Sequence, residues 1–420
     1  MTATRIEELR DFYLRELTED TIPFWIGHGI DREQGGLLDF LDRQGRVLST
    51  DKGGWIQGRF TWVLSRLIEA YGEKGVRPEW LEAARLCADF VRDRVLSGPG
   101  GRAYYELTRE GKPLVLRRYL FSETFAIIAL AQYAKATGDR AYLDKALATL
   151  AVLDANRGKL EPKIDPTTRR MRGHSETMIL INVHQVLREA LRARDPRAVE
   201  EQTRRIDVQI EELFRYFVRP ERRALLETVN YDGSIAEGLE GTCINPGHAI
   251  ETAWFLMEEG RWRGDYSLVE RSLPLLEWSL ERGWDPVYGG LFSFVDLEGG
   301  TPAQIEWDMK YWWPHCEATY ACLLAWALTG EARWERWFET LHEYTWKRFP
   351  DPVHGEWFGY LRRDGSVAND LKGNHFKGAF HVPRFELYSG ILLDALATRG
   401  RGFEKLKGAD ALLRLSGARS

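Results

Sequence analysis

The stretch GGLFSFVDLEG at Gly289–Gly299 is one of five copies of a short cassette that recurs along the chain. The other copies are GGLLDFLDRQG (Gly35–Gly45), GRAYYELTREG (Gly101–Gly111), RALLETVNYDG (Arg223–Gly233) and GEWFGYLRRDG (Gly355–Gly365). Their final glycines lie 66, 122, 66 and 66 residues apart, and 122 is two periods of 61. A fixed period of this length indicates an internal repeat, so we expect six units, one of them without a recognisable cassette.

The segments between the cassettes have the apolar spacing of helices. Apolar residues recur at i, i+3, i+4 and i+7, which predicts amphipathic helices that bury one face. The segments are RFTWVLSRLIEAYGEKG, SETFAIIALAQYAKATGD, SETMILINVHQVLREALRARD, AIETAWFLMEEGRWRGD and HCEATYACLLAWALTGE. A second helix follows most of them, for example WLEAARLCADFVRDRVL. Each unit is therefore expected to be a helix pair followed by a β-hairpin, whose turn is the Gln-Gly, Glu-Gly or Asp-Gly that ends the cassette.

Six helix pairs can form an open solenoid or a closed ring. The segments FAIIALA and MILINV are apolar nearly all round, which favours buried inner helices inside an outer set. We therefore expect an all-α fold, an (α/α)6 barrel with short β-hairpins gathered at one end, formed by residues 1–420 as a single domain. In one unit, a proline-interrupted loop near KLEPKIDPTTRRMRGHSETM is expected to replace the hairpin. The polar residues 399–420 are expected to form a frayed tail.

The composition excludes several classes of protein. The 420 residues carry a formal net charge of −5, so the chain lacks the positive charge that nucleic-acid binding requires. The N-terminal MTATRIEELRDFYLREL predicts a charged amphipathic helix rather than a signal peptide, and no apolar run reaches the ~20 residues of a membrane span. The four cysteines have no paired-ligand spacing, which suggests reduced thiols. We expect a cytoplasmic protein that binds a small molecule and binds neither nucleic acid nor membrane.

Chemically reactive side chains follow the turn glycines at nearly constant offsets. Arg59, Glu123, His248, His315 and His381 lie 14, 12, 15, 16 and 16 residues after the final glycine of the preceding cassette. A constant offset places these residues at equivalent positions in their units. In a closed ring, a guanidinium, a carboxylate and three imidazoles would therefore meet at one end of the barrel.

Two of the histidines lie in sequence contexts that favour acid–base chemistry. His248 follows the turn Asn-Pro-Gly at a helix start, and Glu251 lies on the same helical face, where a carboxylate can fix the imidazole tautomer. His381 lies between Lys377 and Arg384, and nearby cations would lower its pKa and keep it neutral, as a base at pH 7 requires. The alternative for His248 is a structural role in satisfying backbone groups at the helix start.

Arg59, His315 and His174 each allow a functional and a structural interpretation. A buried arginine needs anionic or hydrogen-bonding partners, so Arg59 either pairs with a carboxylate such as Glu306 or stabilises negative charge on a substrate oxygen. His315 follows two tryptophans and precedes Glu317, and it either lines a pocket or packs in the core. His174 is the counterpart in the unit without a hairpin, where it either contacts substrate or caps a helix.

No metal and no nucleotide cofactor is predicted. The chain has no His-Glu-x-x-His motif, and the candidate imidazoles are 66 to 74 residues apart with no second ligand beside them. No glycine-rich phosphate-binding motif follows a predicted strand.

Six segments of the chain, in order, resemble the N-acylglucosamine 2-epimerase family, which includes the mammalian renin-binding proteins and is related to the cellobiose 2-epimerases. They are FW-x-x-H-x-x-D-x-E-x-GG (Phe24–Gly36), WIQGR (Trp55–Arg59), NPGHAIE (Asn245–Glu251), IEWDMKYWWPH (Ile305–His315), DPVHGEWFGYL (Asp351–Leu361) and FKGAFHVPR (Phe376–Arg384). The resemblance extends from about Phe24 to Arg384. It implies an (α/α)6 barrel and reversible inversion at C2 of N-acetylglucosamine and N-acetylmannosamine.

The resemblance also implies roles for individual residues. The two catalytic histidines of the family fall on His248 and His381, and its substrate-binding arginine falls on Arg59. The candidate substrate-binding residues, which either match pocket positions of the family or stand beside the histidines, are Glu251, Glu306, Trp312, His315, His174 and Lys377. Because loss of the C2 proton gives a planar intermediate, inversion requires one base on each face, which histidines from two different units can supply.

One segment departs from the family pattern. Close N-acetylglucosamine epimerases are apolar where this chain has RGHSET (Arg172–Thr177), and relatives that act on unsubstituted sugars are more polar there. The alternative function is therefore an epimerase or aldose–ketose isomerase of mannose, glucose and fructose. A glycoside hydrolase would need two carboxylates across a glycosidic bond, and a pure binding protein would not need both histidines and Arg59. By analogy with the family, a homodimer is considered as well.

Overall fold

A computed structural model of the protein describes residues 1–162 and 164–418. Six of its helices form an inner set: α3 (Gly54–Gly75), α5 (Phe121–Thr137), α7 (His174–Leu191), α10 (Pro246–Arg263), α12 (Trp312–Thr329) and α14 (His381–Arg399). Six others pack outside them: α1 (Ala3–Arg15), α4 (Pro78–Asp93), α6 (Arg140–Asn156), α8 (Pro196–Glu212), α11 (Tyr266–Gly283) and α13 (Ala332–Arg348). The shorter helical segments are η1 (Glu16–Thr21), α2 (Ile22–His28), η2 (Val95–Ser97), η3 (Pro99–Gly101), η4 (Leu213–Phe217), η5 (Pro220–Arg222), α9 (Leu239–Thr242), α15 (Phe403–Leu406) and η6 (Ser416–Ala418).

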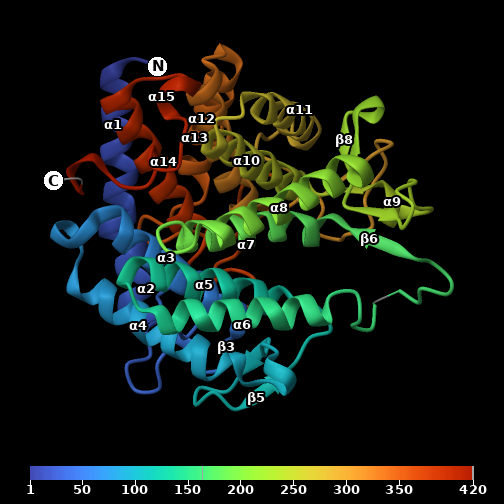
Figure 1. Cartoon of the computed structure of the whole chain (residues 1–420). Helices are drawn as coiled ribbons and strands as arrows, with labels where there is room; N and C mark the ends of the chain where they lie inside the picture. Colours follow the sequence, from blue (N-terminus) through green and yellow to red (C-terminus); the bar gives the residue numbers. More distant parts are fainter. Residues whose placement is uncertain (163, 419–420) are drawn as a thin grey trace.

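The inner helices form a closed ring. Each of them contacts the next along the chain, and α14 contacts α3, while the outer helices α4, α6, α8, α11, α13 and α1 pack on α3, α5, α7, α10, α12 and α14. In Figure 1, the N-terminal α1 (blue) lies along α14 (red), the inner helix on which it packs. The predicted (α/α)6 barrel is confirmed.

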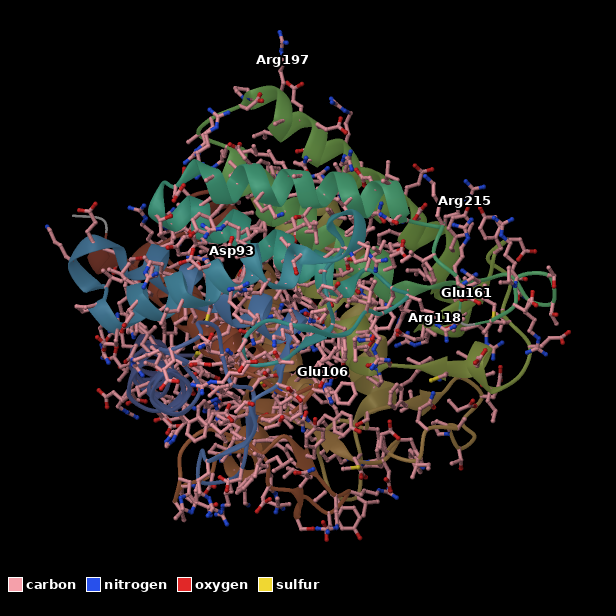
Figure 2. The ribbon with its side chains drawn as sticks, turned by 90° about the horizontal axis from the view of Figure 1, so that it is seen from below. Asp93, Glu106, Arg118, Glu161, Arg197 and Arg215 are labelled. Atoms are coloured by element: carbon pink, nitrogen blue, oxygen red, sulfur yellow. The ribbon has the colours of Figure 1, made fainter. Side chains whose placement is uncertain are left out.

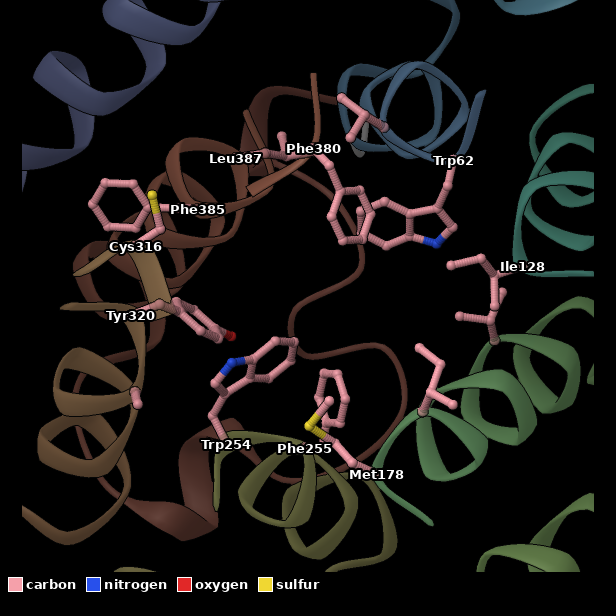
Figure 3. Close-up of a cluster of buried hydrophobic side chains, with 14 of the residues drawn as sticks. Trp62, Ile128, Met178, Trp254, Phe255, Cys316, Tyr320, Phe380, Phe385 and Leu387 are labelled. Atoms are coloured by element: carbon pink, nitrogen blue, oxygen red, sulfur yellow. The ribbon is translucent and has the colours of Figure 1, made fainter. Parts of the chain in front are cut away.

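The burial of the helices follows the apolar pattern of the sequence. Residues 122–134 of α5 and 314–328 of α12 are buried without interruption, as an inner helix requires. Figure 3 shows Trp62, Met178, Trp254 and Phe380 pointing into the space between the inner helices. The outer α8 buries only one stripe, and Arg197 at its start points away from the protein in Figure 2.

The strands are short and lie near the starts of inner helices. They are β1 (Phe40–Leu41), β2 (Val47–Ser49), β3 (Lys52–Gly53), β4 (Glu106–Leu107), β5 (Pro113–Val115), β6 (Met171–Gly173), β7 (Val218–Arg219), β8 (Ala224–Leu225), β9 (Thr228–Asn230), β10 (Cys243–Ile244), β11 (Val295–Asp296), β12 (Lys310–Tyr311), β13 (Tyr360–Leu361) and β14 (Val367–Asn369). They pair antiparallel as β1-β2, β3-β4-β5, β6-β9, β7-β8, β10-β11 and β12-β13-β14. Because β3, β6, β10 and β12 lead into inner helices and pair with strands of the next cassette, the strands lie at the end of the barrel where these helices begin.

The turns of the five cassettes have the backbone that their glycines suggest. The final glycine of each cassette has a φ between 79° and 92°, a left-handed conformation that glycine adopts without strain. In the unit without a cassette, residues 164–170, which lead into β6, extend away from the helices in Figure 1. The strand β6 pairs with β9 of the following cassette, so His174, which follows β6, is tied to that cassette.

Three ion-pair triads join the hairpin ends of different units. In each triad, an aspartate follows an outer helical segment. It forms ion pairs with a lysine that precedes an inner helix and with an arginine at a hairpin turn. The triads are Asp31–Lys52–Arg109, Asp285–Lys310–Arg363 and Asp351–Lys372–Arg43. The aspartate and lysine side chains are at most 1% exposed. The third triad links the last hairpin region to the first hairpin, so it closes the ring at this end.

The C-terminal residues differ from the expected frayed tail. Residues 399–418 fold back over the opposite end of the barrel, where Leu406 and Leu412 are buried. The Arg66 guanidinium donates to the carbonyls of Leu412 (3.0 Å) and Leu413 (2.8 Å), and Ser416 bonds to the buried Asp394. The buried leucines of this otherwise polar segment, and the hydrogen bonds from the buried Arg66, hold it in place. Within the described part of the chain, no helix combines the length and apolarity that crossing a bilayer requires.

Candidate active site

A cavity of about 320 Å³ opens at the end of the barrel where the inner helices begin. All six inner helices contribute to its wall, each through its first nine residues or the segment before it. The wall consists of Trp55, Arg59, Phe121, Phe125, Ser175, Met178, Ile179, Asn182, His248, Glu251, Trp312, Trp313, Phe376, Phe380, His381 and Arg384. Its volume falls at the lower end of small-molecule sites, about 300–1,000 Å³. In Figure 2, which views the molecule from below, Glu106 of the neighbouring β4 lies near the middle and Arg215 near the rim.

His248 is oriented by a carboxylate from the preceding hairpin. Asn245 caps α10 by accepting from the His248 amide (3.1 Å), which fixes the backbone at this point. The His248 Nδ1 lies 2.8 Å from Glu227 Oε1. Because an ionised carboxylate can only accept, Nδ1 carries the proton and Nε2 remains for chemistry. The predicted orienting partner, Glu251, is therefore not the residue that holds His248.

His381 has a corresponding arrangement at the start of α14, two inner helices further round the ring. Its Nδ1 lies 2.7 Å from Glu317 Oε1, and Glu317 in turn accepts from Trp254 Nε1 (2.8 Å) and Arg384 Nη2 (2.7 Å). His381 and Glu317 are buried, so these bonds form away from bulk water. The Nε2 of His381 is again the nitrogen that is left for a substrate.

The two imidazoles differ in their affinity for a proton. Burial disfavours the charged form of His248, but the negative charge and hydrogen bond of Glu227 outweigh it, so the pKa of His248 is raised. Burial and then the positive charges of Arg384 and Arg59 hold the pKa of His381 well below its ordinary value. Lys377 and Arg384 were predicted to lower the pKa of His381, and Arg384 has this effect. At neutral pH this difference favours a proton donor at His248 and a neutral base at His381.

Glu251 belongs to a cluster around Arg384. The Arg384 guanidinium donates to both Glu251 and Glu317, and the two carboxylates hold the pKa of Arg384 above its ordinary value in spite of burial. Glu251, Glu317 and His381 also have ligand atoms within 4.8 Å of one another. Arg384 already supplies positive charge to these carboxylates, so the arrangement is that of an ion-pair network that includes His381.

Arg59 lies on the cavity wall inside a cage of aromatic rings. Its guanidinium carbon lies 4.8, 4.3 and 5.2 Å from the ring centroids of Trp55, Phe125 and Phe380. Burial lowers its pKa to about 10, which leaves it charged at neutral pH. Among the described residues, no carboxylate forms an ion pair with it within 4.0 Å, so the alternative pairing with Glu306 does not occur. A charged guanidinium without an anionic partner at a cavity wall is suited to bind a substrate oxygen.

Trp313 lies between the two candidate bases. Its ring centroid is 5.3 Å from that of His248 and 5.7 Å from that of His381. Trp312, the first residue of α12, also lines the cavity, as predicted, and lies 6.2 Å from the His381 ring. A flat indole between two imidazoles can support one face of a small ligand while each imidazole approaches it from its own side.

Four predicted substrate-binding residues lie outside the cavity wall. His315 is fully buried: its Nε2 accepts from the Leu291 amide (2.9 Å), its Nδ1 donates to the Tyr311 carbonyl (2.6 Å), and burial lowers its pKa to about 3. Both ring nitrogens serve the backbone, so the structural interpretation holds for His315.

The other three are placed away from the cavity by their own contacts. Lys377 is fully buried and pairs with Glu356, and it also donates to a carbonyl at 3.0 Å. Glu306 lies in the turn before β12, where its carbonyl accepts from the Met309 amide (3.1 Å). His174 is fully buried behind the wall, with its Nε2 at 2.9 Å from Thr252 Oγ1.

Three residues of the site were missed or assigned no role from the sequence. Glu227 has a detectable signal: it stands six residues before Gly233, where Asp39 stands six residues before Gly45, so the cassettes align two acidic residues. Glu317 aligns with Glu251 because each occupies the sixth position of its inner helix. Trp313 carries no comparable signal, since aromatic residues are common throughout the core.

A second cavity, of about 130 Å³, lies at the other end of the barrel beneath the C-terminal segment. Its charged groups neutralise one another: Lys135 bridges Glu69 (2.9 Å) and Glu189 (3.0 Å), and Arg188 pairs with Glu259. This pairing fits a structural network better than a substrate site.

Comparison with known proteins agrees with this geometry. The family model described as N-acylglucosamine 2-epimerase (GlcNAc 2-epimerase) matches residues 35–382. The chain is similar to the N-acylglucosamine 2-epimerase of Bos taurus, with 36% identity over 404 residues, which covers 93% of this chain and 92% of the relative. The Homo sapiens protein of the same name is 35% identical over 391 residues, covering 90% and 88% of the two chains.

Solved structures share the fold at lower identity. The cellobiose 2-epimerase of Spirochaeta thermophila superposes with a TM-score of 0.77 at 21% identity, covering 94% of this chain and 98% of that one. A D-mannose isomerase superposes with a TM-score of 0.75 at 18% identity, covering 91% and 97%. With the family model matched over most of the barrel, the chain belongs to the N-acylglucosamine 2-epimerase family.

Proposed function

We propose that this protein is a sugar 2-epimerase, an isomerase that interconverts N-acyl-D-glucosamine and N-acyl-D-mannosamine. The observation that carries the proposal is a pair of imidazoles on one cavity wall, His248 and His381, each with its Nδ1 bound to a carboxylate. The relatives from Bos taurus and Homo sapiens, which are 36% and 35% identical to this chain, are both named N-acylglucosamine 2-epimerase.

The chemistry requires an acidic C–H bond and two bases. Only the open-chain aldehyde acidifies the proton at C2, and its loss gives a planar enolate or enediol. To invert the centre, a second group must return a proton to the face opposite the one that lost it. The Nε2 atoms of His248 and His381 come from α10 and α14, which are separated in the ring by α12. Two groups on separate helices fit the need for opposite approaches.

The different proton affinities assign the roles in one direction. His381, whose pKa is lowered, removes the C2 proton, and His248, whose pKa is raised, donates a proton to the other face. In the reverse reaction the two histidines exchange these roles. After each turnover in either direction, both must return to their starting protonation states. Glu227 and Glu317 hold both rings in the required tautomer in either direction.

Arg59 contributes the electrostatic part of catalysis. Negative charge develops on O1 when the C2 proton leaves, and the position of the Arg59 cation on the cavity wall supports a role in stabilising that oxygen. General acid–base catalysis contributes roughly 10²–10⁴-fold, which alone is small for a weakly acidic C–H bond. An oxyanion-stabilising donor adds about 10²–10³-fold.

The α7 part of the wall bears on the substituent at C2. Met178 and Ile179 offer apolar surface for an acyl methyl group, which supports the N-acylated substrate. Ser175 and Asn182 on the same helix are polar and could bind a hydroxyl of an unsubstituted sugar, which supports the alternative epimerase or aldose–ketose isomerase of mannose, glucose and fructose.

A substrate panel tests the proposal. The purified protein is incubated separately with N-acetylmannosamine, N-acetylglucosamine, mannose, glucose and fructose, and the products are separated by chromatography. We expect N-acetylglucosamine from N-acetylmannosamine, and the reverse, with little conversion of the others. Interconversion of mannose and fructose without turnover of the N-acetylated sugars would contradict it.

We also propose a cytoplasmic location. The four cysteines are free and buried, as expected for a protein of a reducing compartment. Cell fractionation with an antibody to the protein tests this assignment, and recovery in a membrane or secreted fraction would contradict it.

A further inference from the structure

His174 is a buried titratable group that the proposed reaction does not use. It starts α7 behind the cavity wall, it is 0% exposed, and its amide donates to the carbonyl of Glu227 (2.9 Å). Its ring centroid lies 6.4 Å from that of His248. The imidazole is therefore close to a candidate catalytic histidine without reaching the substrate cavity.

The hydrogen bond to Thr252 fixes a proton on one nitrogen of His174. The hydroxyl oxygen of Thr252 lies 2.9 Å from the carbonyl oxygen of His248. A carbonyl has no hydrogen, so two oxygens this close require the Thr252 hydroxyl hydrogen between them. Thr252 Oγ1 can then only accept from His174 Nε2, which lies 2.9 Å away. Nε2 consequently carries a hydrogen.

The other nitrogen of His174 faces a negative charge. Its Nδ1 is buried, has no hydrogen-bond partner within 3.5 Å among the described residues, and lies 3.7 Å from Glu227 Oε2. A neutral ring with hydrogen on Nε2 would direct a lone pair from Nδ1 toward the carboxylate. A ring protonated on both nitrogens instead donates from Nε2 to Thr252 and places a positive charge at ion-pair distance, 3.7 Å, from Glu227.

Glu227 is therefore shared between two imidazoles. Its Oε1 holds His248 and its Oε2 faces His174, and the two rings together keep the pKa of Glu227 well below its ordinary value against the effect of burial. One carboxylate thus interacts with two groups that compete for its charge.

We propose that His174 is a positioning residue that holds a proton beside Glu227 and thereby limits how strongly Glu227 favours the protonated form of His248. This role rests on the proposed two-base epimerisation, in which His248 must both gain and lose a proton at neutral pH. With Glu227 acting on His248 alone, the imidazole would stay protonated and would serve poorly as a base.

Other charged groups around His248 set the background for this effect. Glu251 favours its protonated form and Arg59 opposes it. His381 is a second titratable group on the same cavity wall, and the charge of His248 contributes to lowering the pKa of His381. The Cys243 thiol lies near Glu227, and burial and then that carboxylate raise the pKa of Cys243 to about 11. None of these groups changes when His174 is replaced, so the effect of His174 can be isolated.

The substitution His174→Gln tests the role. The glutamine amide nitrogen can replace Nε2 as donor to Thr252, but it carries no positive charge. We expect the limb of the kcat/KM pH profile that reports His248 to move to higher pH in both reaction directions. For a unit charge 6.4 Å away, effective dielectric constants between 80 and 20 give a shift of roughly 0.5 to 2 pH units.

His184→Gln is the matched control on the same helix. His184 is also buried, and its Nδ1 bonds to Gln202 (2.7 Å) rather than to a group of the site. This control should leave the limb in place. Thr252→Val is a second variant for the case that His174→Gln does not fold: it removes the acceptor that fixes the Nε2 hydrogen, and the limb should move in the same direction by a smaller amount.

Nitrogen-15 NMR of histidine-labelled protein reads the proton directly and needs no turnover. The His174 and His248 signals are assigned by their loss in His174→Gln and His248→Asn. We expect hydrogen on both nitrogens of His174 at pH 7 and a His248 titration that moves upward in His174→Gln. A neutral His174 with a bare Nδ1, or an unchanged His248 titration, would overturn the inference. Absence of epimerisation in the wild type would instead refute the proposed function, and the NMR result would still decide the protonation of His174.

Discussion

Replacing Glu227 by glutamine isolates the charge that controls His248. Glutamine keeps an oxygen that can accept from His248 Nδ1, so the tautomer and the ring position are preserved while the negative charge is lost. The bond to be weakened is 2.8 Å long and links a carboxylate to an imidazole whose side chain is 28% exposed. Hydrogen bonds to charged groups are worth about 1.5–3 kcal/mol, which corresponds to roughly one to two pH units in the titration of the imidazole.

The sign of the effect follows from the direction of the pKa shift. The Glu227 charge raises the pKa of His248 against burial, so its loss lowers that pKa. The limb of the pH profile that reports His248 should move to lower pH in both directions of the reaction. At pH 7, the direction that needs His248 as proton donor should slow, by at most about 10- to 100-fold, because the protonated fraction falls by up to one decade per unit of pKa shift.

Initial rates between pH 5 and 9, measured in each direction by chromatography of the two epimers, provide the assay. Glu221→Gln, on an exposed residue of the short η5 segment, is the matched control and should leave the profile unchanged. If the limb of Glu227→Gln stays in place or moves to higher pH, Glu227 does not act on His248 through its charge. The opposite shifts expected for Glu227→Gln and His174→Gln make the pair of variants more informative than either alone.

Further predictions concern the oxyanion, the ring closure and acid stability. Arg59→Met should lower kcat/KM by about 10²–10³-fold with the fold intact by circular dichroism, and near-normal turnover would exclude a role for this cation. Asp351→Asn should lower the free energy of unfolding in urea by about 3–5 kcal/mol, because it leaves the fully buried Lys372 without its ion-pair carboxylate. The control Asp364→Asn, at an exposed position, should not change it. Equal urea midpoints for Asp351→Asn and the wild type would refute the closure role. The cationic partners hold the pKa values of the triad aspartates well below the ordinary range despite burial. The stability that these aspartates contribute is therefore present above pH 4 and should be lost as the pH falls further. A urea midpoint of unfolding that does not change between pH 5 and pH 2 would contradict this.

The repeat made the barrel predictable from the sequence. A period near 61–66 residues, apolar segments without a polar face and glycine turns at equivalent positions leave few arrangements other than a closed double ring. The C-terminal segment was not predictable in the same way. Its packing depends on carbonyls that accept from Arg66 and Arg261, and such contacts leave no periodic pattern in the sequence.

The candidate site was predictable only in part. His248, His381, Arg59 and Trp312 lie on one cavity wall as expected. His315 has the same offset from its turn glycine as His381 and still points elsewhere, because α12 begins at Trp312, three residues before it, whereas α14 begins at His381. Three residues advance a side chain by about 4.5 Å along the helix axis, so an offset counted from the turn glycine does not by itself place a side chain at the cavity.

The spacing of residues in the sequence also did not predict hydrogen-bond partners that come from different units of the barrel. Glu251 follows His248 by three residues and was expected to hold it, but its carboxylate reaches Arg384 instead. The partner of His248 is Glu227, which the hairpin before α10 brings to it from the preceding unit. Helical spacing shows which residues share a face and does not show which group from another element approaches that face.

Exchange at C2 in D₂O tests the two-base account most directly. N-acetylmannosamine is incubated with the wild type and with His248→Asn and His381→Asn, and deuterium at C2 of both epimers is followed by NMR at early times. The account predicts that wild-type product carries deuterium at C2 while unconverted substrate keeps hydrogen, and that neither variant inverts the centre although one remaining base can still exchange the proton. Wild-type product that retains the original hydrogen at C2, or inversion at a near-normal rate in either variant, would contradict it.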